Sequence, residues 1–162
     1  PWARRGSRTD EYVHAMRVLW DRDDTSFEGE FVSFEGVSCN PKPAQGSVPI
    51  VVGGNSEPAI RRAARLADGY FPATGDTSFD VAGAVQALRK ETHAAGRDPD
   101  AIEVMAGCPD CLPGSGKDPL KAVADRAAAG VARVVLPVNA FEADLEGMLA
   151  EFGAKVIAPS NV

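Results

Sequence analysis

The chain has 162 residues, of which 44% are hydrophobic and 25% are charged, as expected for a globular domain with its own core. The formal charge of −6 argues against nucleic-acid binding, and no apolar run is long enough to cross a membrane. The first residues lack a secretory signal, and the three cysteines are too few for a disulfide scaffold. We therefore expect a single domain, residues 1–162, in the cytoplasm.

Residues 1–48 predict a leading helix followed by a β-hairpin. After an irregular start, Thr9 can cap a helix whose apolar residues recur at helical spacing. Residues 27–34 alternate aromatic and polar side chains around a glycine, which predicts a short hairpin with one wet face. The hairpin phenylalanines fit a small core better than a stacking platform for a ligand. The apolar residues of the helix are Tyr12, Val13, Met16, Leu19 and Trp20.

The run at residues 50–52 is apolar and β-branched without polar alternation, so it predicts a strand buried on both faces. Gly53 and Gly54 then allow a sharp turn and a close approach to a ligand. Asn55 or Ser56 can cap the next helix, whose free N–H groups favour an anion such as phosphate. From the glycine pair alone, a tight turn that binds nothing is the simpler interpretation.

From residue 49 to 162 a strand followed by a helix recurs four times, which predicts a parallel sheet. The strands begin near Ile50, Tyr70, Ile102 and Val134. Four such units fit an open doubly wound sheet or half of an eight-stranded barrel, and the pattern does not decide between them. The helices are expected over 57–67, stopped by Asp68-Gly69; from Ser78 to Gly96; from Asp118 to Gly130; and from Asn139 or Ala140 onward. Their expected inward residues are Ile60, Ala63, Ala64 and Ala67; Val81, Ala84, Val85 and Leu88; Leu120, Val123, Ala124 and Ala127; and Phe141, Leu145, Met148, Leu149 and Phe152.

Cys108 and Cys111 form a CxxC motif, which can serve dithiol redox chemistry or half of a zinc site. The motif follows a strand, and no second pair or nearby histidine completes four ligands, so we expect two unpaired loop thiols and no metal. The arginines at 61, 62 and 65 fit a solvated helix face, with contact to an acidic cofactor tail as the lesser option. His14 and His93 fit helix-surface positions, and no catalytic residue can be assigned.

A set of short segments stands in a fixed order along the chain: Arg5-Gly6 with Asp10-Glu11 and Leu19-Trp20, then residues 27–31, 41–45, 49–54 and 63–70. Together they resemble the bacterial luciferase-like monooxygenase family, which includes the coenzyme F420-dependent oxidoreductases. The resemblance covers essentially the whole chain and implies a TIM barrel, of which this chain corresponds to the later half. The fold class is then α/β, a parallel (βα)4 half-barrel of strands five to eight with an N-terminal helix and hairpin. In the family, the absent first four units carry much of the flavin or deazaflavin ring site.

The resemblance implies that the cofactor, F420 or FMN, contacts Gly53 and Gly54 through its phosphate-bearing tail, with Asn55 and Ser56 in the same turn. It places Ala73 and Thr74 nearby, although turn geometry alone can explain Thr74. The richness in Ala, Gly and Arg indicates a GC-rich gene and slightly favours F420.

Two functions follow from the resemblance. The first is the C-terminal half of a flavin- or F420-dependent oxidoreductase or monooxygenase, not active alone. The second is a non-catalytic dimeric half-barrel that binds a phosphate-type anion at Gly53-Gly54, and thiol redox through the CxxC motif is a distant third. A half-barrel leaves edge strands and an inner face uncovered, so we expect a homodimer or the missing N-terminal half as partner.

Overall fold

The computed structural model describes residues 3–72, 79–112, 114–141 and 144–160. Four parallel strands form one sheet, and their order across the sheet follows their order along the chain. Within the described residues this order lacks the reversal point of a doubly wound sheet. The strands are β3 (Val51–Gly53), β4 (Gly69–Phe71), β5 (Glu103–Gly107) and β6 (Arg133–Val135).

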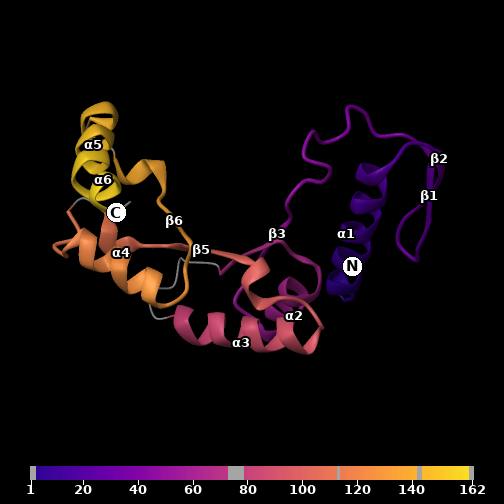
Figure 1. Ribbon diagram of the computed structural model, residues 1–162, viewed down its shortest axis with the longest axis horizontal. Helices are drawn as coiled ribbons and strands as arrows, with labels where there is room; N and C mark the ends of the chain where they lie inside the picture. The colour runs from indigo at the N-terminus through magenta and orange to yellow at the C-terminus, as the bar shows by residue number, and fades with distance from the viewer. Residues whose placement is uncertain (1–2, 73–78, 113, 142–143, 161–162) are drawn as a thin grey trace.

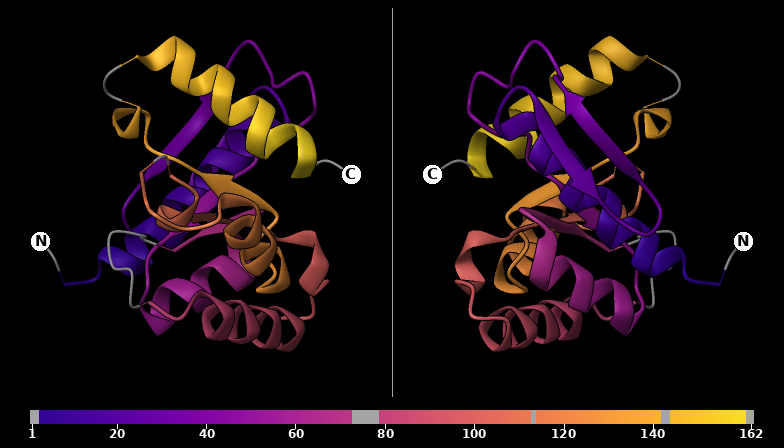
Figure 2. Two further views of the ribbon diagram at one scale, coloured as in Figure 1. Left: turned by 90° about the vertical axis from the view of Figure 1, so that its left-hand side faces the viewer. Right: turned by 90° about the vertical axis from the view of Figure 1, so that its right-hand side faces the viewer.

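Three helices follow the first three strands, and a further helical segment ends the chain (Figure 1). Figures 1 and 2 show α2 and α3 side by side on one side of the sheet, with α5 and α6 at the far end of the molecule from them. None of the helices in the described residues is long and apolar enough to span a bilayer. The helices are α2 (Glu57–Leu66), α3 (Val81–Ala94), α4 (Pro119–Ala128), α5 (Leu145–Phe152) and α6 (Ala158–Ser160), with a π-helical turn over Gly153–Ile157 and short 3₁₀ turns at Pro99–Ala101, Pro109–Cys111 and Val138–Ala140.

The predicted leading helix and hairpin are both present. The helix is α1 (Arg5–Asp21), and the hairpin pairs β1 (Thr25–Glu28) with β2 (Ser33–Val37) in antiparallel register. Phe27 and Phe34 stack with their ring centroids 5.8 Å apart, which supports the interpretation of these rings as a small hairpin core.

The predicted start of α1 is wrong, because helical hydrogen bonding begins a full turn earlier. Arg4 occupies the N-cap position, and the Arg8 N–H donates to its carbonyl at 3.1 Å. The Thr9 hydroxyl instead donates to the Arg5 carbonyl inside the helix, at 2.9 Å. The predicted apolar face is covered in part: Val13 is buried and Leu19 and Trp20 are half-buried, whereas Tyr12 and Met16 are exposed.

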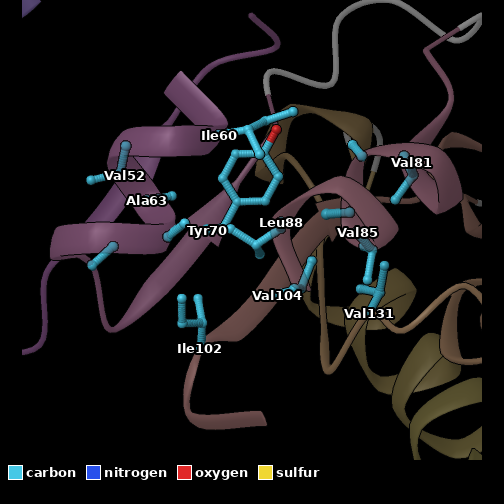
Figure 3. Packing of buried hydrophobic residues seen from close by; sticks show 14 residues of the cluster. Val52, Ile60, Ala63, Tyr70, Val81, Val85, Leu88, Ile102, Val104 and Val131 are labelled. Carbon is cyan, nitrogen blue, oxygen red and sulfur yellow. The ribbon is translucent and has the colours of Figure 1, made fainter. Parts of the chain in front are cut away.

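One cluster of buried side chains lies between the sheet and helices α2 and α3 (Figure 3). Tyr70 from β4 and Leu88 from α3 are almost completely buried at its centre. Every inward residue predicted for α2 and α3 is buried, because the apolar positions repeat at the helical period. The cluster comprises Val52, Ile60, Ala63, Ala64, Ala67, Tyr70, Val81, Ala84, Val85, Leu88, Ile102, Val104, Ala106 and Val131.

The prediction that the first strand is buried on both faces is wrong. Val52 is 7% exposed, whereas its neighbour Val51 is 44% exposed. Successive strand residues point to opposite faces, and helices α2 and α3 cover the face that carries Val52. The other face we call the open face. From the register it carries Val51, Gly53, Gly69, Phe71, Glu103, Met105, Gly107, Arg133 and Val135.

Several predicted helix boundaries also need correction. The cap of α3 is Asp80, whose carboxylate accepts the Gly83 N–H at 2.9 Å, and the predicted cap Ser78 lies outside the described residues. The last helix begins at Leu145, with Asp144 as its cap, and not at Asn139 or Ala140. Asp118 does cap α4 as predicted, by accepting the N–H groups of Leu120 and Lys121.

Of two glycines predicted to end helices, Gly96 does so and Gly69 does not. Gly96 follows α3 with φ +72°, the left-handed conformation predicted for a helix stop. Gly69, in contrast, lies within β4, and the chain leaves α2 through an extended Ala67. A Cβ at Gly69 would lie 3.1 Å from Val51 Cγ2 and 3.2 Å from the Glu103 carbonyl oxygen, so this glycine allows three strands to pack closely.

The C-terminal helices are packed more loosely than α2 and α3. In α4 the buried residue is Ala122, while the predicted inward residues Leu120, Ala124 and Ala127 are exposed. None of the residues of α5, all of which the structure describes, is buried. Phe141 is buried and packs edge-on against Phe152, with ring centroids 5.7 Å apart.

Candidate functional site

The carboxyl ends of parallel strands meet at one edge of the sheet, where loops can form a site. This edge carries the turn Gly53–Ser56 after β3, residues 108–111 after β5 and residues 136–139 after β6. The predicted cofactor residues Gly53, Gly54, Asn55 and Ser56 thus lie together between β3 and α2. Ala73 and Thr74 lie outside the described residues.

The turn at Gly54 needs a glycine. Its φ is +122°, a value that side-chain-bearing residues rarely adopt, and a Cβ there would lie 3.0 Å from the Ala59 Cβ. The Gly54 N–H donates to the Phe71 carbonyl at 3.3 Å, which ties the turn to the end of the neighbouring strand β4. The backbone at Gly53 is exposed at the edge of the sheet, where a ligand could approach it closely.

A buried tyrosine holds this turn from below. The Tyr70 hydroxyl donates to the Gly54 carbonyl at 2.9 Å, and the Tyr70 ring is fully buried among Ile60, Ala63 and Leu88 (Figure 3). Burial raises the pKa of the Tyr70 phenol, so the hydroxyl stays protonated and able to donate. Because a peptide unit is planar, fixing the Gly54 carbonyl also fixes the direction of the next N–H, that of Asn55.

Helix α2 starts at this turn and directs its positive end toward the sheet edge. Ser56 is at the N-cap position as predicted, but its side chain makes no capping hydrogen bond. Its carbonyl accepts the N–H groups of Ala59 and Ile60 at 2.9 and 3.0 Å. The Glu57 carboxylate in the first turn pairs with Arg61 at 3.0 Å, which offsets its charge near any bound anion.

The solvated arginine face predicted for α2 is confirmed for Arg61 and Arg65, which are 47% and 57% exposed, and is wrong for Arg62. Arg62 and Arg65 both pair with Asp10 of α1, with a distance of 3.0 Å from Arg65 Nη2 to Asp10 Oδ2. The Arg62 side chain is 16% exposed. The reason is that α1 packs against α2 and brings a carboxylate between them, so these arginines fasten two helices together.

The prediction of unpaired thiols at the CxxC motif is wrong. A disulfide joins Cys108 and Cys111, whose Cα atoms are 5.3 Å apart because the 3₁₀ turn at Pro109–Cys111 folds the chain back. Both residues are buried, whereas Cys39 is free and exposed. In the described part of the chain, no group of three or more His, Cys, Asp and Glu side chains could hold a metal ion.

Two residues that fix this part of the fold escaped the sequence analysis. Tyr70, interpreted as a plain strand residue, holds the turn from the core. Asp68, interpreted as a helix stop, lies at the opposite, amino end of the sheet, where its Oδ2 accepts the Ile50 N–H at 2.8 Å and the Arg17 guanidinium at 2.9 Å. The signal for Tyr70 is a polar group in an apolar strand, which needs a partner when it is buried.

The sequence profile of a family described as luciferase-like monooxygenase matches residues 1–148. An uncharacterized protein of Mycobacterium tuberculosis is 37% identical over 99 residues, covering 60% of this chain and 34% of the relative. An FMNH2-dependent dimethylsulfone monooxygenase of Pseudomonas putida is 33% identical over 100 residues, covering 59% and 27%. The chain thus matches about a third or less of these relatives' lengths.

Among solved structures, the coenzyme F420-dependent tetrahydromethanopterin reductase of Methanopyrus kandleri superposes with a TM-score of 0.78 at 16% identity. The superposition covers 95% of this chain and 63% of the reductase. At this identity the similarity establishes a common fold and nothing more specific.

Proposed function

Because the chain belongs to the luciferase-like monooxygenase family, we propose that it is the C-terminal part of a flavin- or F420-dependent oxidoreductase. The match over residues 1–148 carries this proposal. Strands β3 to β6 then correspond to strands five to eight of a TIM barrel, and their unbroken parallel order supports that correspondence. The small share of each relative that the chain matches is consistent with a part of a longer enzyme.

The open face of the sheet supports the same proposal. In a closed barrel this face is the packed interior, and here it carries Val51 and Val135 at 44% and 39% exposure. Glu103 and Arg133 pair on it at 2.9 Å. We infer that in the whole enzyme four further βα units cover this face and complete the cofactor's ring site. Where this chain stands alone, a second copy takes their place as a homodimer.

The described residues fit the phosphate-bearing tail of such a cofactor. At the β3–α2 turn a glycine with positive φ brings exposed backbone to the positive end of a helix, and Arg61 compensates the nearby Glu57. Gly53, Gly54, Asn55 and Ser56 would hold the tail, while Tyr70 fixes the turn from the core. When bound, FMN or F420 supplies the hydride or oxygen chemistry, and the protein positions it and excludes water.

A titration with FMN and with F420, followed by cofactor absorbance and fluorescence, tests this proposal. We expect the absorbance or fluorescence of one of the two cofactors to change when the protein is added. Gly54→Ala should weaken the response by roughly tenfold, since a Cβ there is both strained and crowded. Gly153→Ala is the matched control, because Gly153 is helical, with no atom near its added Cβ and no contact with the turn.

The outcomes are distinct. A cofactor response that Gly54→Ala weakens and Gly153→Ala does not would support a tail site at this turn. A response that both variants leave unchanged would move the site elsewhere in the chain. No response to either cofactor would leave the family and the fold in place but remove the cofactor contact from these residues.

A further inference from the structure

The disulfide at the end of β5 has no part in the proposed cofactor site. Cys108 and Cys111 are 2% and 1% exposed and form a second small cluster with Ala122. Val134 and Leu136, from β6 and the residues after it, pack against this cluster. The cysteine pair is therefore the point at which α4, β6 and the 3₁₀ turn at Pro109–Cys111 meet.

This disulfide adds little stability by restricting the unfolded chain. A disulfide restricts the unfolded chain more when it closes a longer loop, and here the two cysteines are only three positions apart. The CxxC spacing is instead common in pairs that cycle between dithiol and disulfide, with reactivity set by nearby cations.

A cavity of about 300 Å³ leads to this pair. Cys111 lies in its wall, between the loop at residues 114–117 and the C-terminal helical segment. Lys117 and Lys155 also line it, and Lys155 already pairs with Glu151. The positive charge in the cavity wall, chiefly that of Lys117, would attract an anionic thiol and stabilise a thiolate at Cys111.

We propose that Cys108 and Cys111 form a reversible dithiol–disulfide site that exchanges with an anionic low-molecular-weight thiol entering through this cavity. The thiolate of the small thiol attacks Cys111 Sγ, the bond between the two cysteines breaks, and Cys108 leaves as a thiolate that takes up a proton. A second small thiol then attacks the mixed disulfide and releases Cys111. Two small thiols are oxidised to their disulfide, and their two electrons reduce the cysteine pair.

Reduction has a structural consequence. Once the bond is broken, the two sulfur atoms must separate to van der Waals distance inside a cluster that contains just one other buried residue, Ala122. The cavity wall at residues 114–117 and the segment at residues 145–157 that lies across from it lose a fixed support. The exchange would therefore loosen the end of the molecule that lies farthest from α2 and α3 (Figures 1 and 2).

The test uses the folded protein carrying Cys39→Ser, so that the pair supplies every thiol. The protein is equilibrated with mixtures of reduced and oxidised glutathione, quenched with N-ethylmaleimide and weighed intact. We expect a single step from no label to two labels within the glutathione range. Amide hydrogen exchange of the reduced form should be at least tenfold faster over residues 114–120 and 145–157, with α2 unchanged.

Two lysine variants test the route. Lys117→Ala should slow reduction by glutathione about two- to threefold at low salt, the usual effect of one surface charge. Lys121→Ala is the matched control, since Lys121 is exposed on α4, pairs with Asp125 and does not line the cavity. Equal slowing by both variants would overturn the proposed route.

Three results would overturn the proposal itself. These are two labels in the air-oxidised folded protein, no reduction at any glutathione ratio unless the protein is first unfolded, and reduction that leaves hydrogen exchange unchanged. The experiment needs no cofactor, so its outcome is independent of the FMN and F420 titrations.

Discussion

The two ends of the sheet are packed in different ways. Around β3, β4 and β5, helices α2 and α3 bury thirteen side chains in one cluster, to which Val131 adds a fourteenth from outside; we call the described part of residues 50–107 the first region. The second region, the described part of residues 108–160, buries the disulfide with Ala122 and, outside that cluster, Phe141 and Val156. It leaves a groove of about 660 Å³ between α4, β6 and the C-terminal helices. The first region supplies its own core, whereas the second depends on a covalent bond and exposes apolar surface.

This difference shows which part of the chain can be stabilised by contacts between residues that are close in sequence. In the first region each helix packs on the strands before and after it, and the contacts are close in sequence. The second region contains the edge strand β6, and α4 packs mainly against the 3₁₀ turn at Pro109–Cys111 and against α6. An apolar groove of this kind is expected where further elements of a barrel would continue the layer.

The largest contrast should come from truncating one leucine in each region. Leu88→Ala removes a side chain that is 1% exposed and should cost about 2–5 kcal/mol of unfolding free energy. Leu149→Ala removes one that is 45% exposed in the groove and should cost less than about 1 kcal/mol. Urea unfolding of both variants measures the difference. Equal losses would mean that the groove is filled in solution.

A second substitution tests what fastens the first region at its amino end. Asp68→Ala removes the acceptor of the Ile50 N–H and of Arg17, and should cost about 1.5 kcal/mol given that the carboxylate is partly exposed. Asp100→Ala, at an exposed ion pair with Arg89, should change stability by less than about 0.5 kcal/mol. Chemical denaturation of the pair decides this, and an Asp68 effect no larger than the Asp100 effect would contradict it.

A third comparison lies inside the first region and separates stability from site geometry. Tyr70→Phe and Thr92→Val each remove a fully buried hydroxyl that bonds a carbonyl, at 2.9 and 2.7 Å, and each should cost about 1 kcal/mol. Of the two, just Tyr70→Phe should alter the amide NMR shifts of Gly54 and Asn55 and weaken binding of inorganic phosphate there. Identical phosphate titrations for the two variants would show that Tyr70 is purely structural.

The smallest effect concerns the hairpin, which lies outside both regions and is held by Glu11. Burial would raise the pKa of the Glu11 carboxyl, but the N–H groups of Phe31, Val32 and Glu30 outweigh it and lower the pKa below the ordinary 4.5. A lowered pKa stabilises the folded hairpin above the unfolded value, and this is lost as pH falls through the folded value. The protection factors of the Phe31 and Val32 amides, which remove the intrinsic pH dependence of exchange, should therefore fall below pH 4.5, and Glu11→Gln should abolish that dependence. An apparent midpoint above 4.5 would contradict the assignment.

The sequence predicted the first region better than the second, for a physical reason. The inward faces of α2 and α3 follow from helical periodicity, and Gly96 acts as the predicted helix stop. Val51 was misjudged because an apolar strand has the same pattern whether its second face is covered by its own helices or by another layer.

The predictions for the second region were less accurate, because the contacts that determine its structure do not follow from local sequence patterns. Leu120 and Ala124 have helical spacing, but the surface they would pack on is not formed by this chain. The disulfide was missed because spacing alone does not give the Cα separation. At the candidate site the glycine turn was predicted, whereas the bond from Tyr70 to Gly54 joins residues sixteen positions apart, and a local pattern does not identify that partner. The bond from Ile50 to Asp68, at the amino end of the sheet, was missed for the same reason.

The central claim is that the open face of the sheet must be covered by a further protein layer. Light scattering of the purified chain at micromolar concentration tests it most directly, together with Val51→Lys, which places a charge on that face. We predict the mass of two 17.0-kDa chains for the native sequence and a shift toward one for the variant. A monodisperse, folded monomer for the native sequence would contradict the claim.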